Sequence, residues 1–422
     1  MKFNVLNKII KNKILKETSW AFLTKGVTFV LYYIFSIYIA RVMGVDLYGQ
    51  WAFFFSVITI VFTLSYFGIN HSTKRYVAQF SNTPEISAVL KSAVLLRFCF
   101  SLGFCVVFLF FHRLIAIWLG HPELADLFIW ACPLIFFSGF VEFTKDVFIG
   151  FHRIKFNFIV NVCEFGSRLG LVFVFLFFSI NLFSVLKSYL LASIISAGVG
   201  LFLVYRIYYV RQTTSVKAAY WKHIWRYSLP LFFVGIAFIF ATEIGNIMLG
   251  LMQSDYEVGI YSVAKQFTDK LPHISAAIAM GTLPLFGKLD VANKAKLQAM
   301  FKKLLKLNNY LFGGICLGLA LLAPILVPFL YGVQYQSSVL PLQILLIYLF
   351  CFSFSVFTCG VLDYRGRAGT RAWIALGSIV LNIILNLVFI PLWGATGAAL
   401  ATSLAYIPAT ILYYFFAKKT LA

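Results

Sequence analysis

Long apolar stretches separated by short polar segments form the dominant pattern along this chain. An α-helix rises about 1.5 Å per residue, so about 20 consecutive apolar residues cross the hydrocarbon layer of a membrane. Twelve stretches are long enough, and they lie at residues 18–40, 48–69, 88–111, 124–150, 156–178, 184–207, 226–252, 257–284, 305–330, 338–362, 370–390 and 394–416. The pattern predicts an all-α polytopic membrane protein with twelve transmembrane helices.

The composition supports this fold class and restricts the chemistry. Of the 422 residues, 61% are hydrophobic and 12% are charged, and the mean hydropathy is +0.90. A soluble domain does not need so much apolar surface to form a core. The first apolar stretch is full-length and lacks a small-residue cleavage site, so we expect no cleavable signal peptide. All seven cysteines lie within apolar stretches without a CxxC pair, so we expect no metal site, no redox site and no cofactor.

The basic residues are distributed unequally between the two sides of the predicted helices. With the N-terminus in the cytoplasm, 26 of the 35 lysines and arginines fall in cytoplasmic segments or at the helix ends that adjoin them, and only Arg41 and Arg113 fall in outer loops. Positively charged loops stay in the cytoplasm during insertion, so we predict that both termini are cytoplasmic. Because the basic residues are spread over one membrane face, the net charge of +21 does not indicate nucleic-acid binding.

Two cytoplasmic segments carry apolar residues at helical spacing among lysines. Residues 1–17 place Phe3 and Ile10 on one helical face, and residues 293–309 do the same with Leu297 and Phe301. Amphipathic basic helices bind anionic membrane surfaces, so we expect both segments on the inner leaflet. The alternative is a solvated basic loop.

The two halves of the chain contain similar segments 210 residues apart. "MGVDLYGQWAFF" (43–54) follows the first predicted helix and "QSDYEVGIYSVA" (253–264) follows the seventh, so that Gly49 aligns with Gly259. An even number of helices separates the copies, so both have the same topology and are related by an axis along the membrane normal. The repeat predicts two six-helix lobes that face each other across a central cleft.

Several motifs support a resemblance that covers the whole chain. "ARVMGVDLYGQW", "YFGINHSTKRYVAQ" (66–79) and "YEVGIYSVAKQ" (256–266) resemble the polysaccharide transporter family. That family includes the O-antigen and capsular repeat-unit flippases, within the multidrug/oligosaccharidyl-lipid/polysaccharide exporter superfamily. The resemblance implies a V-shaped, two-lobed transporter with alternating access. Its cargo would be an undecaprenyl-pyrophosphate-linked oligosaccharide, moved from the inner to the outer leaflet of the bacterial cytoplasmic (inner) membrane during synthesis of lipopolysaccharide O-antigen or a related surface polysaccharide.

The repeat and the resemblance together give the expected domain organisation and partners. The expected parts are an amphipathic N-terminal segment (1–17), an N-lobe (18–210), a cytoplasmic linker (211–225), a C-lobe (226–416) and a cytoplasmic tail (417–422). The expected partners are the lipid-linked oligosaccharide, membrane lipids and other polysaccharide assembly proteins, such as a polymerase and a chain-length regulator. No nucleic acid is expected.

Charged residues inside the predicted helices are the candidate functional residues. Each costs on the order of 2.5–3.5 kcal/mol at the bilayer centre, so it faces a cavity or a partner. In the resembled fold, helices 1, 2, 7 and 8 line the cleft. The candidate pyrophosphate ligands are Lys25, Lys265 and Lys270, with Arg168 and Arg97 adding positive potential. Pro272 removes a backbone donor just after Lys270 and is predicted to break helix 8.

Other readings of these charges stay open. Glu164 with Arg168, and Lys265 with Asp269, are spaced for ion pairs along one helix face. Glu243 and Asp269 are also candidates for coupling to an ion, because a carboxylate in a low-dielectric site can bind and release a proton. A lysine such as Lys25 can alternatively extend toward the cytoplasmic headgroups.

Three alternative functions compete with the repeat-unit flippase. A multidrug cation antiporter of the same superfamily would bind its cargo through carboxylates, whereas the first helix offers only Lys25. A membrane glycosyltransferase or polymerase would need a large outer loop for its catalytic carboxylates, and the longest outer loop has about a dozen residues after Phe111. A lipid II flippase commonly has two further helices.

The predicted orientation can be tested by cysteine labelling. In a chain whose seven native cysteines are replaced, new cysteines at positions 217 and 296 should react with an impermeant thiol reagent only from the cytoplasm. A cysteine at position 334 should react only from outside, because it follows an outward-running helix. The unsubstituted cysteine-free chain is the control. Labelling of position 296 from outside would reverse the orientation.

Overall fold

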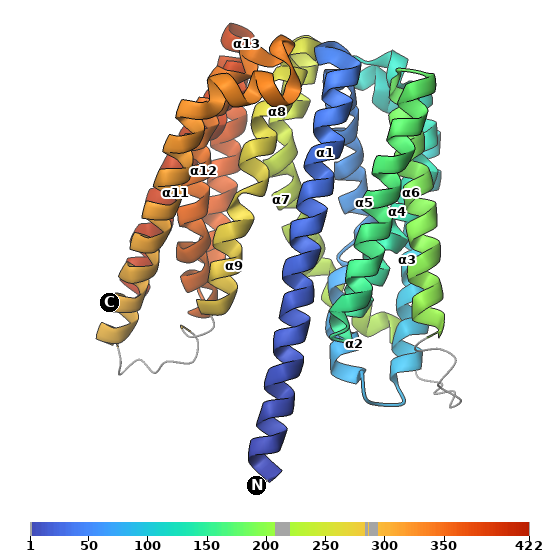
Figure 1. The fold of residues 1–422 in the computed structure, drawn as a ribbon, viewed down its shortest axis with the longest axis vertical. Coiled ribbons are helices and arrows are strands. Elements are labelled where there is room, and N and C mark those ends of the chain that lie inside the picture. The colour runs from blue at the N-terminus through green and yellow to red at the C-terminus, as the bar shows by residue number, and fades with distance from the viewer. Residues whose placement is uncertain (1, 207–219, 283–285, 287–293, 422) are drawn as a thin grey trace. The chain divides into compact units, whose positions relative to one another are not determined.

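The computed structural model describes residues 2–206, 220–282, 286 and 294–421 (Figure 1). Its helices are α1 (Lys2–Tyr66), α2 (Ile69–Phe80), α3 (Ile86–Trp118), α4 (Ala125–Gly150), α5 (Ile154–Phe178), α6 (Leu182–Val204), α7 (Trp221–Met252), α8 (Asp255–Lys270), α9 (Pro272–Thr282), α11 (Lys294–Tyr331), α12 (Val339–Tyr364) and α13 (Ala368–Leu421), with short 3₁₀ turns at Pro122–Leu124 and Val333–Ser338. These described ranges contain no strand, so the all-α prediction is confirmed. The side chains of residues 2–16 lie outside the description, and the predicted leaflet location of residues 1–17 stays a prediction.

Two helices are too long for one membrane crossing. The apolar part of α1 covers Glu17–Tyr66 (50 residues) and α13 has 54 residues. At 1.5 Å per residue each is about 75–80 Å long, more than twice the hydrocarbon thickness. Each therefore contains two crossings. Counted in this way, with α8 and α9 as the halves of one crossing, the helices of the described chain match the twelve predicted stretches.

Glycines with positive φ bend these long helices where outer loops were predicted. Gly44 has φ 77° and ψ 177° within α1, and Gly394 has φ 50° and ψ −126° within α13. Glycine adopts such angles without the steric cost that a Cβ imposes. Glu257 Oε2 accepts a hydrogen bond from the Ala395 amide at 2.6 Å. This carboxylate satisfies a free amide at the start of the second half of α13.

The structure contains a short helix, α2, where the sequence analysis placed a loop. The chain turns at Phe67 and Gly68 and then forms twelve helical residues. Ile69 and Val77 are buried on one face, and most basic residues lie on the other. Twelve residues are too few to cross a membrane, so a search for long apolar stretches does not detect this helix.

The described chain divides into two compact units. Unit 1 consists of residues 1–43 and 54–240, and unit 2 of residues 44–53 and 241–422. The division falls within α7, whereas the sequence analysis placed it at the linker. The first half of α7 groups with unit 1 because it packs against α2, where the hydroxyls of Ser72 and Ser228 lie 2.7 Å apart. Residues 211–219 of the predicted linker, including labelling position 217, lie outside the described residues.

Unit 1 is a bundle of α3, α4, α5 and α6, with α2 packed against it (Figure 1). The central helix is α4, which contacts each of the other four. Its side chains Phe143, Val147 and Phe148 are fully buried in the main apolar cluster. The core of the unit therefore forms around α4, and functional charges on that helix are enclosed by neighbouring helices.

Unit 2 contains α11, α12 and α13 side by side (Figure 1), with α8 against α12. The amphipathic start of α11 (293–309 in the sequence analysis) does not present its apolar face to lipid. Leu297 and Phe301 are buried in an apolar cluster with Ala417 and Leu421 at the end of α13. The predicted location of this segment on the leaflet is therefore wrong for its apolar face, which other helices cover.

Residues 44–53 pack against the start of α8 within unit 2, so the repeated motifs contact each other. A Cβ on Gly49 would overlap the carbonyl oxygen of Asp255, and a Cβ on Gly259 would overlap that of Val45. Gln50 Nε2 donates a hydrogen bond to Asp255 Oδ2 at 2.8 Å. The two glycines paired by the 210-residue offset thus occupy one close contact between backbones.

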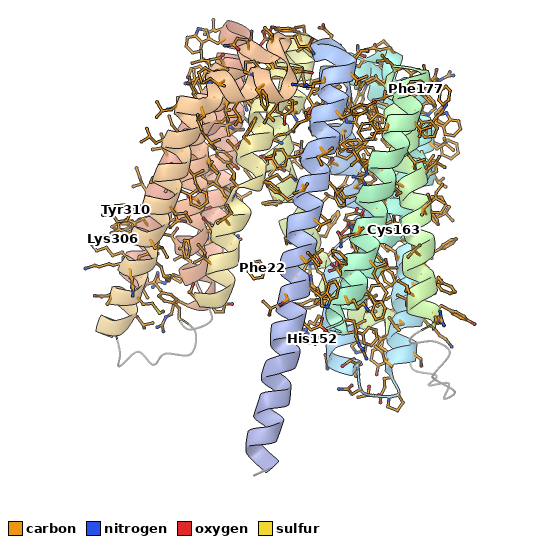
Figure 2. The ribbon with its side chains drawn as sticks, viewed as in Figure 1. Phe22, His152, Cys163, Phe177, Lys306 and Tyr310 are labelled. Carbon is orange, nitrogen blue, oxygen red and sulfur yellow. The ribbon has the colours of Figure 1, made fainter. Side chains whose placement is uncertain are left out.

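Large apolar side chains stand on the outside of the helices. Phe177 is 82% exposed, Tyr310 is 72% exposed and Phe22 is 68% exposed (Figure 2). In water such a surface would be unfavourable, whereas lipid solvates it. The length of the helices and their apolar exterior together establish a multi-pass membrane protein.

The contact at Gly49 predicts the effect of adding one methyl group. Gly49→Ala should lower the thermal unfolding temperature of the purified protein in detergent, because overpacking against backbone costs about 1–3 kcal/mol. Gly103→Ala in α3 is the matched control, since nothing lies within 4 Å of a Cβ there. The control should unfold at the same temperature or higher, because alanine favours the helix. Equal temperatures for both variants would contradict the close contact.

Candidate functional site

In unit 1, four charged side chains form one buried network between α4 and α5. Lys145 Nζ lies 2.7 Å from Glu142 Oε1 and 2.6 Å from Glu164 Oε2. Arg168 donates to the other Glu164 oxygen at 2.6 Å, and its guanidinium stacks over the ring of Tyr189 on α6 at 4.0 Å. The two positive charges in this network balance the two negative charges. The sequence spacing offered an ion pair between Glu164 and Arg168 as an alternative to anion binding, and the structure contains that ion pair.

The network restricts what Arg168 can do for a passing anion. Lys145, Glu164 and Arg168 are each less than one-tenth exposed. Breaking a buried pair by removing one partner leaves an uncompensated charge, which typically costs 3–5 kcal/mol. Arg168 is thus held by Glu164, while Glu142, with 43% of its side chain exposed, is the accessible member of the network.

Arg97 on α3 is also enclosed within unit 1. It is 0% exposed, and its guanidinium donates to the carbonyl oxygen of Ser65 at 3.0 Å and to the hydroxyl of Ser65 at 3.3 Å. The side chain crosses α4 at Gly139 and lies 4.8 Å from the ring centre of Tyr66. These contacts tie the end of α1 to α3 and α4, which is a structural role.

Lys25 has a different environment. It lies within the membrane-crossing part of α1 and its side chain is exposed. Among the side chains that the structure describes, its ammonium forms no ion pair. An exposed lysine inside a crossing helix needs water, a headgroup or an anionic ligand to compensate its charge.

In unit 2, Lys265 on α8 joins the two candidate coupling residues. Its Nζ lies 3.1 Å from Asp269 Oδ2 and 3.5 Å from Glu243 Oε2 on α7. The Lys265–Asp269 pair has the spacing expected from the sequence, whereas the contact with Glu243 joins two helices. With all three groups ionised, the cluster has one more negative than positive charge. Lys265 is therefore already compensated by carboxylates, and a cation or proton suits the cluster better than a phosphate does.

A small cavity adjoins this cluster. Its volume is about 20 Å³, which is room for about one water molecule. Oxygen-bearing side chains of Thr242, Thr268, Tyr261, Tyr348 and Thr402 line it beside Asp269. Such oxygens hydrate or coordinate small hard cations. Two of the residues that line the cavity, Tyr348 on α12 and Thr402 on α13, lie far along the chain from the charged residues of α8. No sequence pattern therefore indicated that they belong to this site.

The helix is interrupted next to the cluster, at the predicted position. α8 ends at Lys270 and α9 begins at Pro272, with Leu271 between them. Lys270 is half-buried at the C-terminal end of α8, where a cation is favoured by the helix dipole. The break thus places Lys270 and Asp269 at a helix end.

Other polar residues of α8 serve packing. Gln266 is buried, bonds to the Tyr48 hydroxyl and accepts a hydrogen bond from the Tyr331 hydroxyl at 2.9 Å. This amide fastens residues 44–53 and α11 to α8. No group of three or more His, Cys, Asp or Glu side chains that could hold a metal ion occurs among the described residues.

Sequence comparison gives two distant relatives that align over most of their length. An uncharacterized membrane protein of Methanocaldococcus jannaschii is 22% identical over 407 residues, covering 93% of this chain and 94% of the relative. A second uncharacterized membrane protein of the same organism is 23% identical, covering 97% of this chain and 85% of the relative. Both agree with the multi-pass membrane assignment.

Comparison with solved structures identifies the fold. The lipid II flippase MurJ in an inward closed conformation has a TM-score of 0.74 at 17% identity, covering 96% of this chain and 89% of MurJ. An inward-facing multidrug resistance MATE family transporter of the MOP superfamily has a TM-score of 0.72 at 15% identity, covering 92% and 94% of the two chains. These likenesses confirm the predicted fold class, twelve transmembrane helices in two lobes.

A sequence profile gives the family of this chain. The profile of the family described as "Polysaccharide biosynthesis protein" matches residues 14–290. The match runs from within α1 to beyond α9 and includes Lys25, the Lys265 cluster and Pro272. It confirms the resemblance drawn from the motifs. This chain belongs to the polysaccharide biosynthesis protein family.

Proposed function

We propose that this protein is a flippase, not an enzyme, and that its cargo is a polyprenyl-pyrophosphate-linked oligosaccharide. In the finer form of the proposal the carrier is undecaprenyl pyrophosphate and the sugar is an O-antigen or related repeat unit. The protein would move this lipid from the inner to the outer leaflet by alternating access. Family membership and the fold shared with a lipid II flippase support the proposal.

The observation that carries the proposal is the exposed ammonium of Lys25 within a membrane-crossing helix. Arg97, Arg168 and Lys265 are held by partners within their own units, as described above. Among the described side chains Lys25 forms no ion pair, so it keeps its charge for a ligand. A pyrophosphate provides strong acceptor oxygens and compensates an ammonium in a low-dielectric site.

We further propose that Lys270 is a second pyrophosphate ligand. Lys265, Arg168 and Arg97, the other candidates from the sequence, are held by partners within their own units, and we do not assign them to the pyrophosphate. The position of Lys270 beside the break at Pro272 supports this role, because a helix break exposes backbone groups and permits movement. Membrane lipids and polysaccharide assembly proteins, including a polymerase and a chain-length regulator, would be the partners. The proposed location is the bacterial cytoplasmic (inner) membrane, for lipopolysaccharide synthesis, with both termini in the cytoplasm.

One observation favours a second candidate, a multidrug cation antiporter. The Lys265, Glu243 and Asp269 cluster has an excess carboxylate beside an oxygen-lined cavity, which suits a cation. The likeness to a MATE transporter agrees with this alternative. An antiporter should export ethidium from intact cells in a manner that depends on Glu243 and is indifferent to Lys25.

Neutralising the two lysines tests the flippase proposal. Lys25→Ala and Lys270→Ala should each abolish export of surface polysaccharide in cells that rely on this protein, at normal protein levels. Lys25→Arg should retain part of the export, because the charge remains while the geometry changes. Flipping of a labelled polyprenyl-pyrophosphate oligosaccharide in proteoliposomes should follow the same order.

A matched control separates cargo binding from general charge effects. Lys187→Ala removes an exposed lysine on α6 that lies near the predicted outer end of its helix. This variant should export normally. Normal export by both Lys25→Ala and Lys270→Ala would refute the cationic site and make these lysines structural.

The charge of the proposed cargo indicates the driving force. Moving one elementary charge through the membrane is worth about 2.3 kcal/mol per 100 mV. An anionic pyrophosphate that moves outward across an inside-negative membrane moves with that field. We propose that the membrane potential assists export without a coupled ion. The competing account is coupling through Glu243 or Asp269, whose cluster with Lys265 has room for a proton or a small cation.

Separate gradients distinguish the two accounts. In proteoliposomes, an inside-negative potential alone should accelerate outward flipping, and a pH gradient alone should not. Glu243→Gln should keep the response to potential, with Glu243→Asp as a charge-conserving control. Transport that ignores the potential, follows the pH gradient and is lost in Glu243→Gln would establish ion coupling instead.

A further inference from the structure

A hollow of about 640 Å³ opens on unit 1, between α2 and the first half of α7. One wall is basic and belongs to α2, with His71, Lys74 and Arg75. The other wall belongs to α7 and is largely apolar, with Tyr227, Leu231 and Phe238. Its volume lies in the range of small-molecule pockets. None of the residues in these two walls belongs to the transport site proposed above.

The basic wall presents its charges together. His71, Lys74 and Arg75 are spaced by three and four residues, which places them on one face of α2. His71 and Arg75 are exposed, and the Arg75 guanidinium lies 4.2 Å above the ring of Tyr227. Within the described residues, Asp146 is the one carboxylate that pairs with this face, at 3.1 Å from Lys74. Two cations and a histidine against one carboxylate leave an excess of positive charge.

The two walls are fixed to each other by polar contacts at their bases. The hydroxyls of Ser72 and Ser228 are buried and lie 2.7 Å apart. The Tyr76 hydroxyl donates to the carbonyl oxygen of His223 at 3.3 Å. A Cβ on Gly68 would overlap the carbonyl oxygen of Ser228, so the helices approach at backbone contact. The hollow is therefore built by the fold and does not require a ligand to form it.

The apolar wall restricts the class of ligand. Leu231 and Phe238 both line the hollow, and they lie on the two sides of a bend in α7 between Phe233 and Phe238. The orientation that we predict from the distribution of basic residues places α2 at the cytoplasmic surface of the membrane. A soluble anion uses only the basic wall, whereas a lipid uses both, with its phosphate at the charges and its chain along the apolar side chains.

We propose that this hollow binds the phosphate of an anionic amphiphile from the inner leaflet. The phosphate oxygens lie on His71, Lys74 and Arg75, and the first part of the chain packs against Leu231 and Phe238. Two sources offer this chemistry, an anionic glycerophospholipid of the bilayer and a polyprenyl phosphate carrier. The proposal concerns residues other than the proposed pyrophosphate ligands, and it holds whether or not the protein is a flippase.

Direct binding to the purified full-length protein tests the site. Phosphatidylglycerol, phosphatidylcholine of the same chains and undecaprenyl phosphate are each titrated into the protein in neutral detergent, and bound lipid is counted by native mass spectrometry. His71→Gln with Arg75→Gln should weaken binding of the anionic lipid about tenfold or more, because charge-assisted hydrogen bonds are lost. Lys155→Gln, which removes an exposed basic residue on α5, should bind as the unsubstituted protein does.

A second pair of variants tests the amphiphile and guards against misfolding. Arg75→Lys keeps the charge and should bind within a few-fold of the unsubstituted protein. Phe238→Ser should weaken binding of the lipid but leave binding of inorganic pyrophosphate unchanged. Each variant must elute as a single species and unfold at the same temperature as the unsubstituted protein. Lys74 is not substituted, because its removal would leave the carboxylate of Asp146 without its ion-pair partner.

The outcomes of these experiments test the proposal and identify which lipid the site binds. Preference for phosphatidylglycerol over undecaprenyl phosphate assigns the site to a bilayer lipid, and the reverse preference assigns it to the carrier. Equal losses in the double variant and in Lys155→Gln would show diffuse attraction and overturn the site. Pyrophosphate binding equal to lipid binding, with no effect of Phe238→Ser, would overturn the amphiphile and leave a site for soluble anions.

Discussion

A charge inside a hydrocarbon layer must be compensated, and this requirement organises the interior of the protein. Arg97 is enclosed by α1, α3 and α4, Arg168 is held by Glu164, and Lys265 bridges Glu243 and Asp269. Each compensation joins different helices or turns of one helix, so the charges also fix how the helices of a unit pack. Lys25 forms no ion pair with any side chain that the structure describes, so its charge is not compensated in this way. This makes Lys25 the candidate for contact with an anionic cargo.

Most of the fold followed from the sequence because membrane crossing imposes a length that can be counted. The apolar stretches and the proline at 272 act locally and coincide with helices and a break, and the paired glycines at 49 and 259 were found because the sequence repeats, and they coincide with a contact. Helix α2 and the burial of the start of α11 were missed for the opposite reason. A twelve-residue helix is too short to cross a membrane, so a search for membrane-length stretches misses it. The sequence of an amphipathic helix does not show whether lipid or protein covers its apolar face.

The candidate site could be predicted only in part. Ion pairs between neighbours on one helix, such as Lys265 with Asp269, are visible as spacing. Contacts between helices are not, so the roles of Lys145 beside Glu164 and of Glu243 beside Lys265 required the structure. The same limit applies to the hollow on α2, where the basic spacing was present in the sequence and the apolar wall came from a helix about 150 residues later.

The division of the chain into units has a consequence for the two similar halves of its sequence. Residues 44–53 group with unit 2 although unit 1 flanks them, and α7 changes unit after Phe240. The chain therefore passes from one unit to the other three times, at residues 43–44, 53–54 and 240–241. Severing it between α6 and α7 would yield two halves, neither of which contains a whole unit. The two halves of the sequence are thus interlaced in the structure, so neither half is an independent module that could be exchanged for a relative's.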